Sequence, residues 1–495
     1  MKALPANIEF ALISHTNNGK TTLARTLLGM DVGEVRDAAH VTLASESHTL
    51  LSTPEGDLLQ LWDTPGFGDS VRLLKRLGTS DNPIGWFLRE VIDRLRDRPF
   101  WLSQQALRTA RDTADVVLYL VNSAENPEDA GYLAAEMKIL QWLGKPVVVL
   151  LNQTGSPRPS LQEQAELSRW RQHLVQYPIA REVLALDAFT RCWVHERVFY
   201  EAVGPLISPP KAAGYARLLA VWEAAQATRF QEAMRLTTLQ LVAAVQDSQP
   251  VPPEKRSLLS TALKATGLRK SGPIQRQDQA MSALLERLNV GIASTTRSLL
   301  ALHRLDPGEA TRINTRVRKN FAIHAPIDQT QAGLLGAVLS GAATGLSADL
   351  LAGGLTLGAG ALLGSVVGAL TFAGIAWGFN STTDRNHPTV QFSDEFLRTF
   401  LQTCVLRYLT VAHFGRGRGN FADSEAPAFW QDEVERSIAI EEKAVNGLLR
   451  TLRTPTEVPQ ALESAQAVLA AITSNTLNAL YPSSRPLKSE RSAPN

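Results

Sequence analysis

The segment of residues 14–21, which reads SHTNNGKT, constrains the fold of this chain more than any other. It matches the P-loop pattern of glycine, four residues, glycine, lysine and a hydroxyl residue, except that Ser14 replaces the first glycine. Such a loop binds phosphate because consecutive backbone N–H groups and a helix N-terminus converge on it. Residues 8–13 before the loop are mostly apolar, and residues 22–28 after it carry leucines on one helical face. The sequence therefore predicts a strand, a phosphate loop and a helix in an α/β fold.

The side chains of this loop fit a nucleotide. Lys20 is expected to contact the β- and γ-phosphates, and Thr21 to bind Mg²⁺. The missing glycine removes no ligand, because the backbone makes the cradle, but Ser14 can strain the turn into the loop. The expected nucleotide contacts here are Ser14, Asn17, Asn18, Gly19, Lys20, Thr21 and Thr22. A chance Asn-Gly turn between two ordinary elements is the alternative interpretation.

A second motif, Asp63-Thr64-Pro65-Gly66, follows the strand pattern of residues 58–62. Asp63 is expected to hold Mg²⁺ through water, and the backbone N–H of Gly66 to meet the γ-phosphate. The next residue is Phe67 rather than glutamine, and an apolar side chain cannot orient the attacking water. Hydrolysis would then need another residue, a monovalent cation or a partner. Two phosphate motifs in this order favour a nucleotide switch over an ordinary Pro-Gly turn.

A threonine between the two motifs is expected to close over Mg²⁺ in the triphosphate state. Thr42 is the first choice, Thr49 and Thr53 are further candidates, and a solvated loop threonine is the alternative. The candidate catalytic positions are Lys20, Thr42 and Gly66, and the candidate metal ligands are Thr21, Thr42 and Asp63.

The base-reading motif of GTPases, Asn-Lys-x-Asp, is incomplete in this chain. The apolar strand pattern of residues 146–151 leads into Asn152, but Gly155 stands at the position of the aspartate. A later strand pattern ends at Asp187, which either supplies the missing carboxylate or caps a helix that starts near Thr190. The residues expected near the base are Asn152, Gln153, Asp187 and Ala188.

With these motifs, residues 7–205 resemble the Era-like GTPases of the translation-factor-related P-loop class. The resemblance rests on residues 16–21, 62–67 and 149–152. It implies a Ras-like fold with a mixed, mostly parallel sheet and a Mg²⁺-dependent site for GTP and GDP. We expect a GTPase of low intrinsic rate. In the potassium-stimulated members, the position of Asn17 binds K⁺. Through residues 186–193 and 413–420 the whole chain is similar to a bacterial group of GTPases with a long C-terminal domain of unknown function.

The chain has 495 residues, which is enough for several domains. We expect a P-loop GTPase domain followed by a mainly α-helical region that includes a Gly/Ala-rich apolar helical hairpin. The expected ranges are 1–207 for the GTPase domain, 211–330 for a helical domain, 331–380 for the hairpin, 390–480 for a C-terminal helical part and 481–495 for a disordered tail.

Composition excludes several classes of function. The formal net charge is +2, so a generic polyanion binder, and DNA as a partner, are not expected. Two cysteines provide no disulfide framework or metal site and fit a reducing cytosol. The N-terminus lacks the basic and apolar regions of a secretory signal. We therefore expect a cytoplasmic protein.

The block of residues 332–379 carries Asp349 as its only formal charge. A membrane-spanning helix needs about 20 mostly apolar residues, and the block is long enough for two. Glycines recur in it at four-residue spacing, which lets helices pack closely in lipid, and basic residues flank both ends. We expect a hairpin that contacts membrane lipid at the cytoplasmic face of the inner membrane, peripherally or integrally. A buried soluble hairpin is the alternative.

Three functions are consistent with the sequence. In the first, the GTPase domain is a switch whose nucleotide state controls membrane association or assembly of the helical part, with homo-oligomers as one form of assembly. In the second, the chain is a membrane-associated scaffold or channel-like protein with a degenerate nucleotide domain. In the third, which rests on Era-like analogy alone, it is a ribosome-associated assembly GTPase with RNA as partner.

Overall fold

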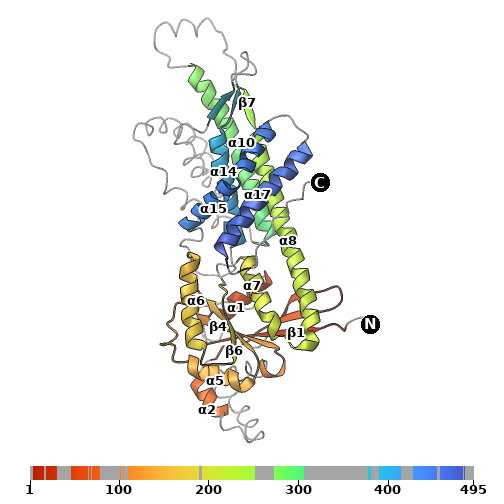
Figure 1. The fold of residues 1–495 in the computed structure, drawn as a ribbon, viewed down its shortest axis with the longest axis vertical. Helices are drawn as coiled ribbons and strands as arrows, with labels where there is room; N and C mark the ends of the chain where they lie inside the picture. Colours follow the sequence, from red (N-terminus) through yellow and green to blue (C-terminus); the bar gives the residue numbers. More distant parts are fainter. Residues whose placement is uncertain are drawn as a thin grey trace, which may run out of the picture. The chain divides into compact units, whose positions relative to one another are not determined.

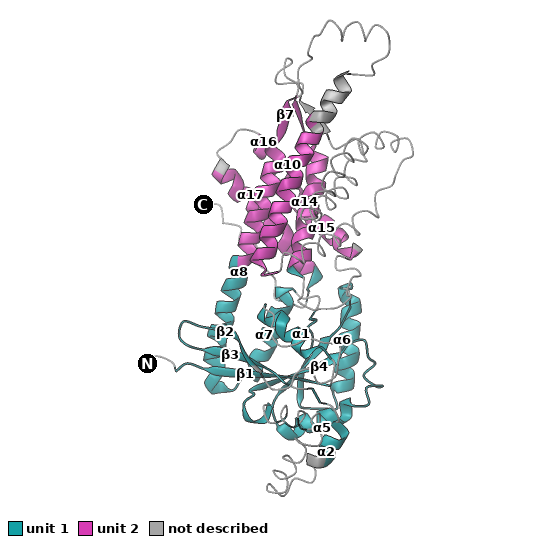
Figure 2. Ribbon diagram, turned by 180° about the vertical axis from the view of Figure 1, so that it is seen from behind, with its two compact units in different colours: residues 1–228, 412–425, 480–486 teal, residues 229–411, 426–479, 487–495 magenta. Residues whose placement is uncertain are grey.

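The computed structural model divides the chain into two compact units, coloured separately in Figure 2. Unit 1 comprises residues 1–228, 412–425 and 480–486, and unit 2 comprises residues 229–411, 426–479 and 487–495. The structure describes residues 4–15, 18–29, 46–64, 66–67, 70–77, 101, 104, 107, 110–155, 157–188, 192–250, 272–305, 377–380, 389–413, 427–453, 458–482 and 484.

Unit 1 is built on a six-stranded sheet with the order β2-β3-β1-β4-β5-β6. Only β2 runs antiparallel, against β3, and the other neighbouring strands are parallel. The strands are β1 Asn7–Ser14, β2 Glu46–Ser52, β3 Leu58–Asp63, β4 Val116–Asn122, β5 Val147–Asn152 and β6 Ala180–Ala185. The predicted Ras-like α/β fold with a mixed, mostly parallel sheet is confirmed.

Helices cover both faces of this sheet, so unit 1 has three layers (Figure 1). Among the described residues, the helices of unit 1 are α1 Lys20–Leu28, α2 Ser70–Leu77, α5 Leu133–Leu143, α6 Ser160–Leu174, α7 Trp193–Val203, the short 3₁₀ helix η1 Gly204–Leu206 and the first half of α8 Pro209–Gln246. One core lies between the sheet and α2, α5 and α6, and the other lies between the sheet and α1, α7 and α8. β5 is buried along its whole length, as expected of a central strand with helices on both faces.

The first half of α8 is fixed to the edge of unit 1 by two ion pairs. Arg217 binds the carboxylate of Asp57 in the turn between β2 and β3, and Lys211 binds Asp115 just before β4. The approach is close at Gly214, where a Cβ atom would lie 2.3 Å from the Cβ of Ala6. Glycine is therefore required at this crossing. The same helix continues to Gln246, past residue 228, where unit 1 gives way to unit 2.

Unit 2 is mainly helical, as predicted. The helices that the structure describes in this unit are the second half of α8, α10 Gly272–Leu302, α14 Asp394–Ala412, α15 Ala428–Ile440, α16 Glu442–Arg453 and α17 Val458–Leu480. A small antiparallel sheet with the order β7-β9-β8 is formed by β7 Ser248–Pro250, β8 Trp377–Asn380 and β9 Thr389–Phe392.

The apolar block of residues 332–379 lies outside the described residues except for its last three, which belong to β8. The sequence pattern predicted a helical hairpin over 331–380, whereas Trp377–Asn380 pair with β9 as a strand. The alternating aromatic residues Trp377 and Phe379 favour this short strand. Within the described ranges, no helix is both long enough and apolar enough to span a bilayer.

Candidate nucleotide site

The P-loop segment connects the end of β1 to the start of α1. Gly19 is the N-cap of α1 and adopts a left-handed backbone conformation, with φ of 84°. A Cβ atom at this position would lie 2.7 Å from Nδ2 of Asn152. Glycine is therefore required here twice over, once by backbone conformation and once by space. The loop ends at the N-terminus of α1. At such a position the backbone N–H groups of the first helical turn and the positive end of the helix dipole favour an anion.

Lys20 lies buried at the first position of α1, and its Nζ donates a hydrogen bond to Oγ of Ser14 over 3.0 Å. Burial lowers the pKa of Lys20, and the nearby negative charges of Asp63 and Glu136 oppose that shift. Ser14 occupies the position of the first P-loop glycine, and its hydroxyl gives the lysine a partner. The ammonium group is thus held inside the loop, where phosphate oxygens would compete with the hydroxyl for it.

The two predicted metal ligands with described positions meet in space. Oγ1 of Thr21, at the start of α1, donates a 2.6 Å hydrogen bond to Oδ2 of Asp63, at the end of β3. A hydroxyl and a carboxylate oxygen at this separation are hard ligands of the kind that Mg²⁺ prefers. The donor set therefore fits the metal that the sequence predicts.

The loop after Asp63 is held against β1 and the P-loop. Oγ1 of Thr64 donates to the backbone oxygen of Leu12 over 2.6 Å, and the backbone N–H of Phe67 donates to the oxygen of Ser14 over 2.9 Å. The Phe67 side chain is fully buried in the core between the sheet and α2. Phe67 therefore has a packing role, and Gly66 is placed between two residues that are both bonded to the strand.

Asn152 links the loops on the base side. Its Nδ2 donates to the backbone oxygen of Asn18 over 2.8 Å, and its Oδ1 accepts the backbone N–H of Ala188 over 2.9 Å. The backbone oxygen of Ala188 in turn accepts a 2.7 Å hydrogen bond from Oγ1 of Thr26 on α1. One buried amide thus ties the P-loop to the loop after β6.

Asp187 reaches from the loop after β6 to the loop after β5. Its Oδ2 accepts hydrogen bonds from the backbone N–H of Thr154 over 2.6 Å and from Oγ1 of Thr154 over 3.0 Å. The carboxylate therefore lies beside Gly155, the residue that replaces the usual base-reading aspartate. The alternative cap role for α7 is wrong, because Cys192 is the N-cap of that helix.

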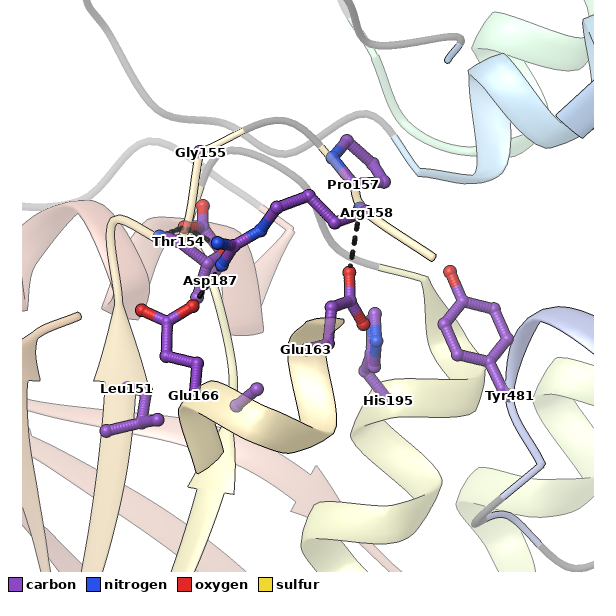
Figure 3. A pocket seen from close by; sticks show the side chains of 11 residues that line it. Leu151, Thr154, Gly155, Pro157, Arg158, Glu163, Glu166, Asp187, His195 and Tyr481 are labelled. Carbon is purple, nitrogen blue, oxygen red and sulfur yellow. Dashed lines mark hydrogen bonds and ion pairs between the residues drawn. The ribbon is translucent and has the colours of Figure 1, made fainter. Parts of the chain in front are cut away.

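A pocket opens next to these two loops, and Figure 3 shows Asp187 and Thr154 side by side at its edge. Tyr481, from the C-terminal part of unit 1, lies at the other side of the pocket and packs edge-on against His195 of α7, with ring centroids 4.5 Å apart. The lining residues are Leu151, Thr154, Gly155, Pro157, Arg158, Glu163, Glu166, Ala185, Asp187, His195 and Tyr481.

The remaining predicted residues divide into two groups. In the first group, Thr22 is buried in α1. Gln153 adopts a φ of 59°, and its side chain lies near the P-loop, with Nε2 3.8 Å from the position that a Cβ atom on Gly19 would occupy. Asn17 and Thr42 lie outside the described residues.

Sequence reasoning missed a group of side chains that joins His15 of the P-loop segment to residues of β4, α5 and the N-cap of α5. The group consists of His15, Glu136, Tyr119 and Tyr132. The available signal was Glu136 among mostly apolar residues 133–140, where Lys138 is the other charged residue, together with a histidine inside the P-loop segment.

Two family models match different parts of the chain. Residues 9–153 match a model described as 50S ribosome-binding GTPase, which covers β1 through β5 and the two phosphate motifs. Residues 180–472, more than half of the chain, match a model described as Domain of unknown function (DUF3482). No curated protein matches the chain.

Several solved structures are similar to the chain at low identity. One is Era in complex with MgGDPNP and nucleotides 1506–1542 of 16S ribosomal RNA, at 18% identity over 37% of this chain and 51% of that one, with a TM-score of 0.28. Another is a point variant of Aquifex aeolicus Era bound to GDP.AlF4-, at 14% identity over 58% of this chain and 90% of that one, with a TM-score of 0.31. A third is a mutation variant of SsGBP, at 17% identity over 36% and 50%, with a TM-score of 0.23. The chain thus spans about half the length of the first and third of these structures.

Proposed function

The chain belongs to the DUF3482 family and carries an Era-like P-loop GTPase domain in its N-terminal part, and from this premise we propose that it is a GTP-driven switch acting on its own helical C-terminal part. The observation that carries the proposal is the position of β3. One end of this strand bears Asp63, beside the predicted metal site, and the turn before its other end bears Asp57, which binds Arg217 of α8. A shift of Asp63 would therefore be passed along β3 to Asp57 and, through Arg217, to α8, the helix that continues into unit 2.

On the nucleotide side, we assign Lys20 to the phosphates and Thr21 and Asp63 to Mg²⁺. A bound Mg²⁺ would neutralise charge that develops on the phosphate oxygens during transfer to water. Lys20 would exchange the hydroxyl of Ser14 for the β- and γ-phosphates, and the Gly66 N–H would meet the γ-phosphate. Thr42 and Asn17 keep the roles that the sequence predicts, a switch threonine over Mg²⁺ and a K⁺ position.

On the base side, Asp187 is assigned the role of the missing aspartate. Its carboxylate is held against Thr154, in the loop where the guanine edge is read in GTPases of this kind. Asn152 and Ala188 would organise the loops around the base rather than read it, since both are engaged in hydrogen bonds between loops. Guanine selectivity would then come from the loop after β6.

Attachment to a membrane is the proposed output of the switch. Its support is the composition of residues 332–379, which carry a single formal charge. A degenerate nucleotide domain is disfavoured, because Lys20, Thr21 and Asp63 are all present, with Lys20 bonded to Ser14 and Thr21 bonded to Asp63. A role at the ribosome rests on the match of residues 9–153 to the model described as 50S ribosome-binding GTPase.

The test uses the full-length chain with fluorescent GTP, GDP and ATP analogues, followed by hydrogen exchange of unit 2 in the GTP-analogue and GDP states. We expect guanine nucleotides alone to compete, Lys20→Ala to abolish binding, and exchange in α8 and α10 to differ between the two states. Equal competition by ATP would remove the guanine assignment. Binding without any difference in unit 2 would leave a GTPase but refute the switch.

The membrane output is measured separately by co-sedimentation with anionic vesicles in each nucleotide state. Binding to vesicles that depends on GTP supports the proposed output. Equal sedimentation in both states, or none, refutes it.

A further inference from the structure

His15, the second residue of the P-loop segment, is held against α5. Its Nδ1 lies 2.8 Å from Oε1 of Glu136. Its imidazole stacks on the ring of Tyr132, with centroids 4.2 Å apart and planes inclined by 15°. The His15 side chain is 31% exposed and that of Glu136 is 0% exposed, so the contact reaches from the loop surface into the interior.

Glu136 is a buried carboxylate with two partners. The hydroxyl of Tyr119, on β4, donates a 2.6 Å hydrogen bond to its Oε2, and His15 bonds its Oε1. Burial raises the pKa of Glu136, and the hydrogen bonds from His15 and Tyr119 act against that shift. A buried carboxyl group is costly unless it is hydrogen-bonded, so both oxygens are tied to fixed positions. Glu136 is therefore a rigid attachment point for His15.

The contact lies next to the part of the loop that binds phosphate. His15 directly follows Ser14, whose hydroxyl accepts the hydrogen bond from Lys20, so the contact with Glu136 lies one residue from the partner of that lysine. On the far side of the loop, Nδ2 of Asn18 donates to the backbone oxygen of Leu120 on β4 over 3.2 Å. The loop is thus attached to the body of unit 1 both before and after the positions 16 and 17.

A phosphate cradle made of backbone N–H groups binds well only when those groups are already in place before the ligand arrives. We propose that His15 and Glu136 form an anchor that positions the P-loop for the β-phosphate of a nucleoside di- or triphosphate. The inference rests on the proposed nucleotide-binding function and assigns His15 a positioning role, without contact to the reacting atoms.

The anchor also connects the loop to the sensor side of the domain. Met137 and Leu140, next to Glu136 on α5, share a core with Leu73 of α2, the helix that follows Gly66. The helix that holds His15 through Glu136 therefore packs against the helix that follows the sensor.

The experiment measures the dissociation constants of GDP and GTP for the full-length chain and for His15→Ala, His15→Gln and Glu136→Gln, with the melting temperature of each nucleotide-free protein as a check of folding. Because a hydrogen bond to a charged group contributes about 10-fold or more, His15→Ala should weaken GDP and GTP by about 10-fold and by the same factor. His15→Gln, which keeps a donor, should lose less. Asp129→Asn is the matched control, since Asp129 accepts an exposed hydrogen bond from Asn126 in the turn before α5.

A double variant distinguishes a specific contact between His15 and Glu136 from a general loss of packing. In the Glu136→Gln background, replacing His15 by Ala should change the affinity by a smaller factor than in the wild type, because the amide offers the imidazole only a neutral partner. A folded His15→Ala protein that binds both nucleotides like the wild type overturns the anchor, as does full additivity in the double variant. If His15→Ala does not fold, His15→Gln and Glu136→Gln give the same comparison. A wild type that binds no nucleotide overturns the proposed function as well, so the two failures are distinguishable.

Discussion

Arg217 and Asp57, which are 160 positions apart in sequence, form two parallel hydrogen bonds of 2.7 Å between a guanidinium and a carboxylate. The Asp57 side chain is 0% exposed and that of Arg217 is 30% exposed. The carboxylate also accepts hydrogen bonds from the backbone N–H of Ala6 and the hydroxyl of Thr53. One residue in the β2–β3 turn therefore fixes the start of β1, its own turn and the helix α8 together.

Replacing Arg217 by methionine should destabilise unit 1. The variant leaves the buried Asp57 carboxylate without its cation while keeping the aliphatic stem, and we expect a fall of about 3–6 °C in melting temperature. Arg235→Met is the control, because Arg235 pairs with Glu232 on the exposed surface of the same helix. Equal shifts for both variants would contradict the prediction.

The same pair gives a signed pH dependence. Bonding to Arg217 holds the pKa of Asp57 in the folded protein well below its usual range. The ion pair therefore stabilises the fold fully at any pH above the pKa that Asp57 has in the unfolded chain. This stabilisation is lost as the pH falls toward the lowered pKa of the folded protein. The difference in melting temperature between the wild type and Arg217→Met should therefore be full at neutral pH and shrink below about pH 4. Thermal scans at a series of pH values test this, and a difference that grows on acidification would be the opposite of what we expect.

Gly19→Ala should lower nucleotide affinity by at least about 10-fold, because the added methyl group meets Asn152 and the residue must keep a left-handed conformation. Gly29→Ala is a matched control at the other end of α1. Gly29 has a φ of 66°, but a Cβ there would meet nothing within 4 Å. The control should lose some stability and keep its affinity. Similar affinities for the two variants would show that the contact with Asn152 is unimportant.

Asp187→Asn should change the preferred base from guanine to xanthine. A carboxylate accepts the two N–H donors of the guanine edge, whereas an amide offers one acceptor and one donor, which matches xanthine. We expect the ratio of the GDP and XDP dissociation constants to change by about 100-fold or more. If both nucleotides weaken equally, Asp187 only supports the loop at Thr154.

Thr21→Ala should remove most of the effect of Mg²⁺ on GTP binding. Oγ1 of Thr21 and Oδ2 of Asp63 would no longer converge on one ion, so the affinity gained on adding Mg²⁺ should fall by about 10-fold. Titrations with Mg²⁺ and with EDTA measure this gain. Thr26→Val, further along the same helix and bonded to Ala188 instead, should respond to Mg²⁺ like the wild type.

The sequence was sufficient to predict the strands that end at Ser14, Asp63 and Asn152 and the helix that follows Gly19, because these depend on short runs of residues with fixed spacing. It could not predict the partners of these residues. In the sequence, Ser14 shows only that the first glycine of the pattern is replaced. Its bond to Lys20 depends on the curvature of the loop. His15 and Glu136 are 121 positions apart, and only the packing of α5 against the sheet brings them together.

Two further differences have local causes. The sequence allows Asp187 to supply the missing carboxylate or to cap the next helix. Because α7 starts at Trp193 and has Cys192 as its N-cap, Asp187 does not cap this helix. The small sheet of unit 2 pairs Ser248–Pro250 with Thr389–Phe392, and strands of three or four residues carry too few positions to show an alternating pattern.

Unit 1 includes residues 412–425 and 480–486 in addition to residues 1–228. Tyr481 in the last of these segments packs on His195 of α7 and bonds the imidazole of His413. During synthesis the nucleotide-binding unit would therefore remain incomplete until the segment around Tyr481 has left the ribosome. A protein truncated after residue 228 would lack Tyr481 and would expose the part of α7 around His195 that this ring covers.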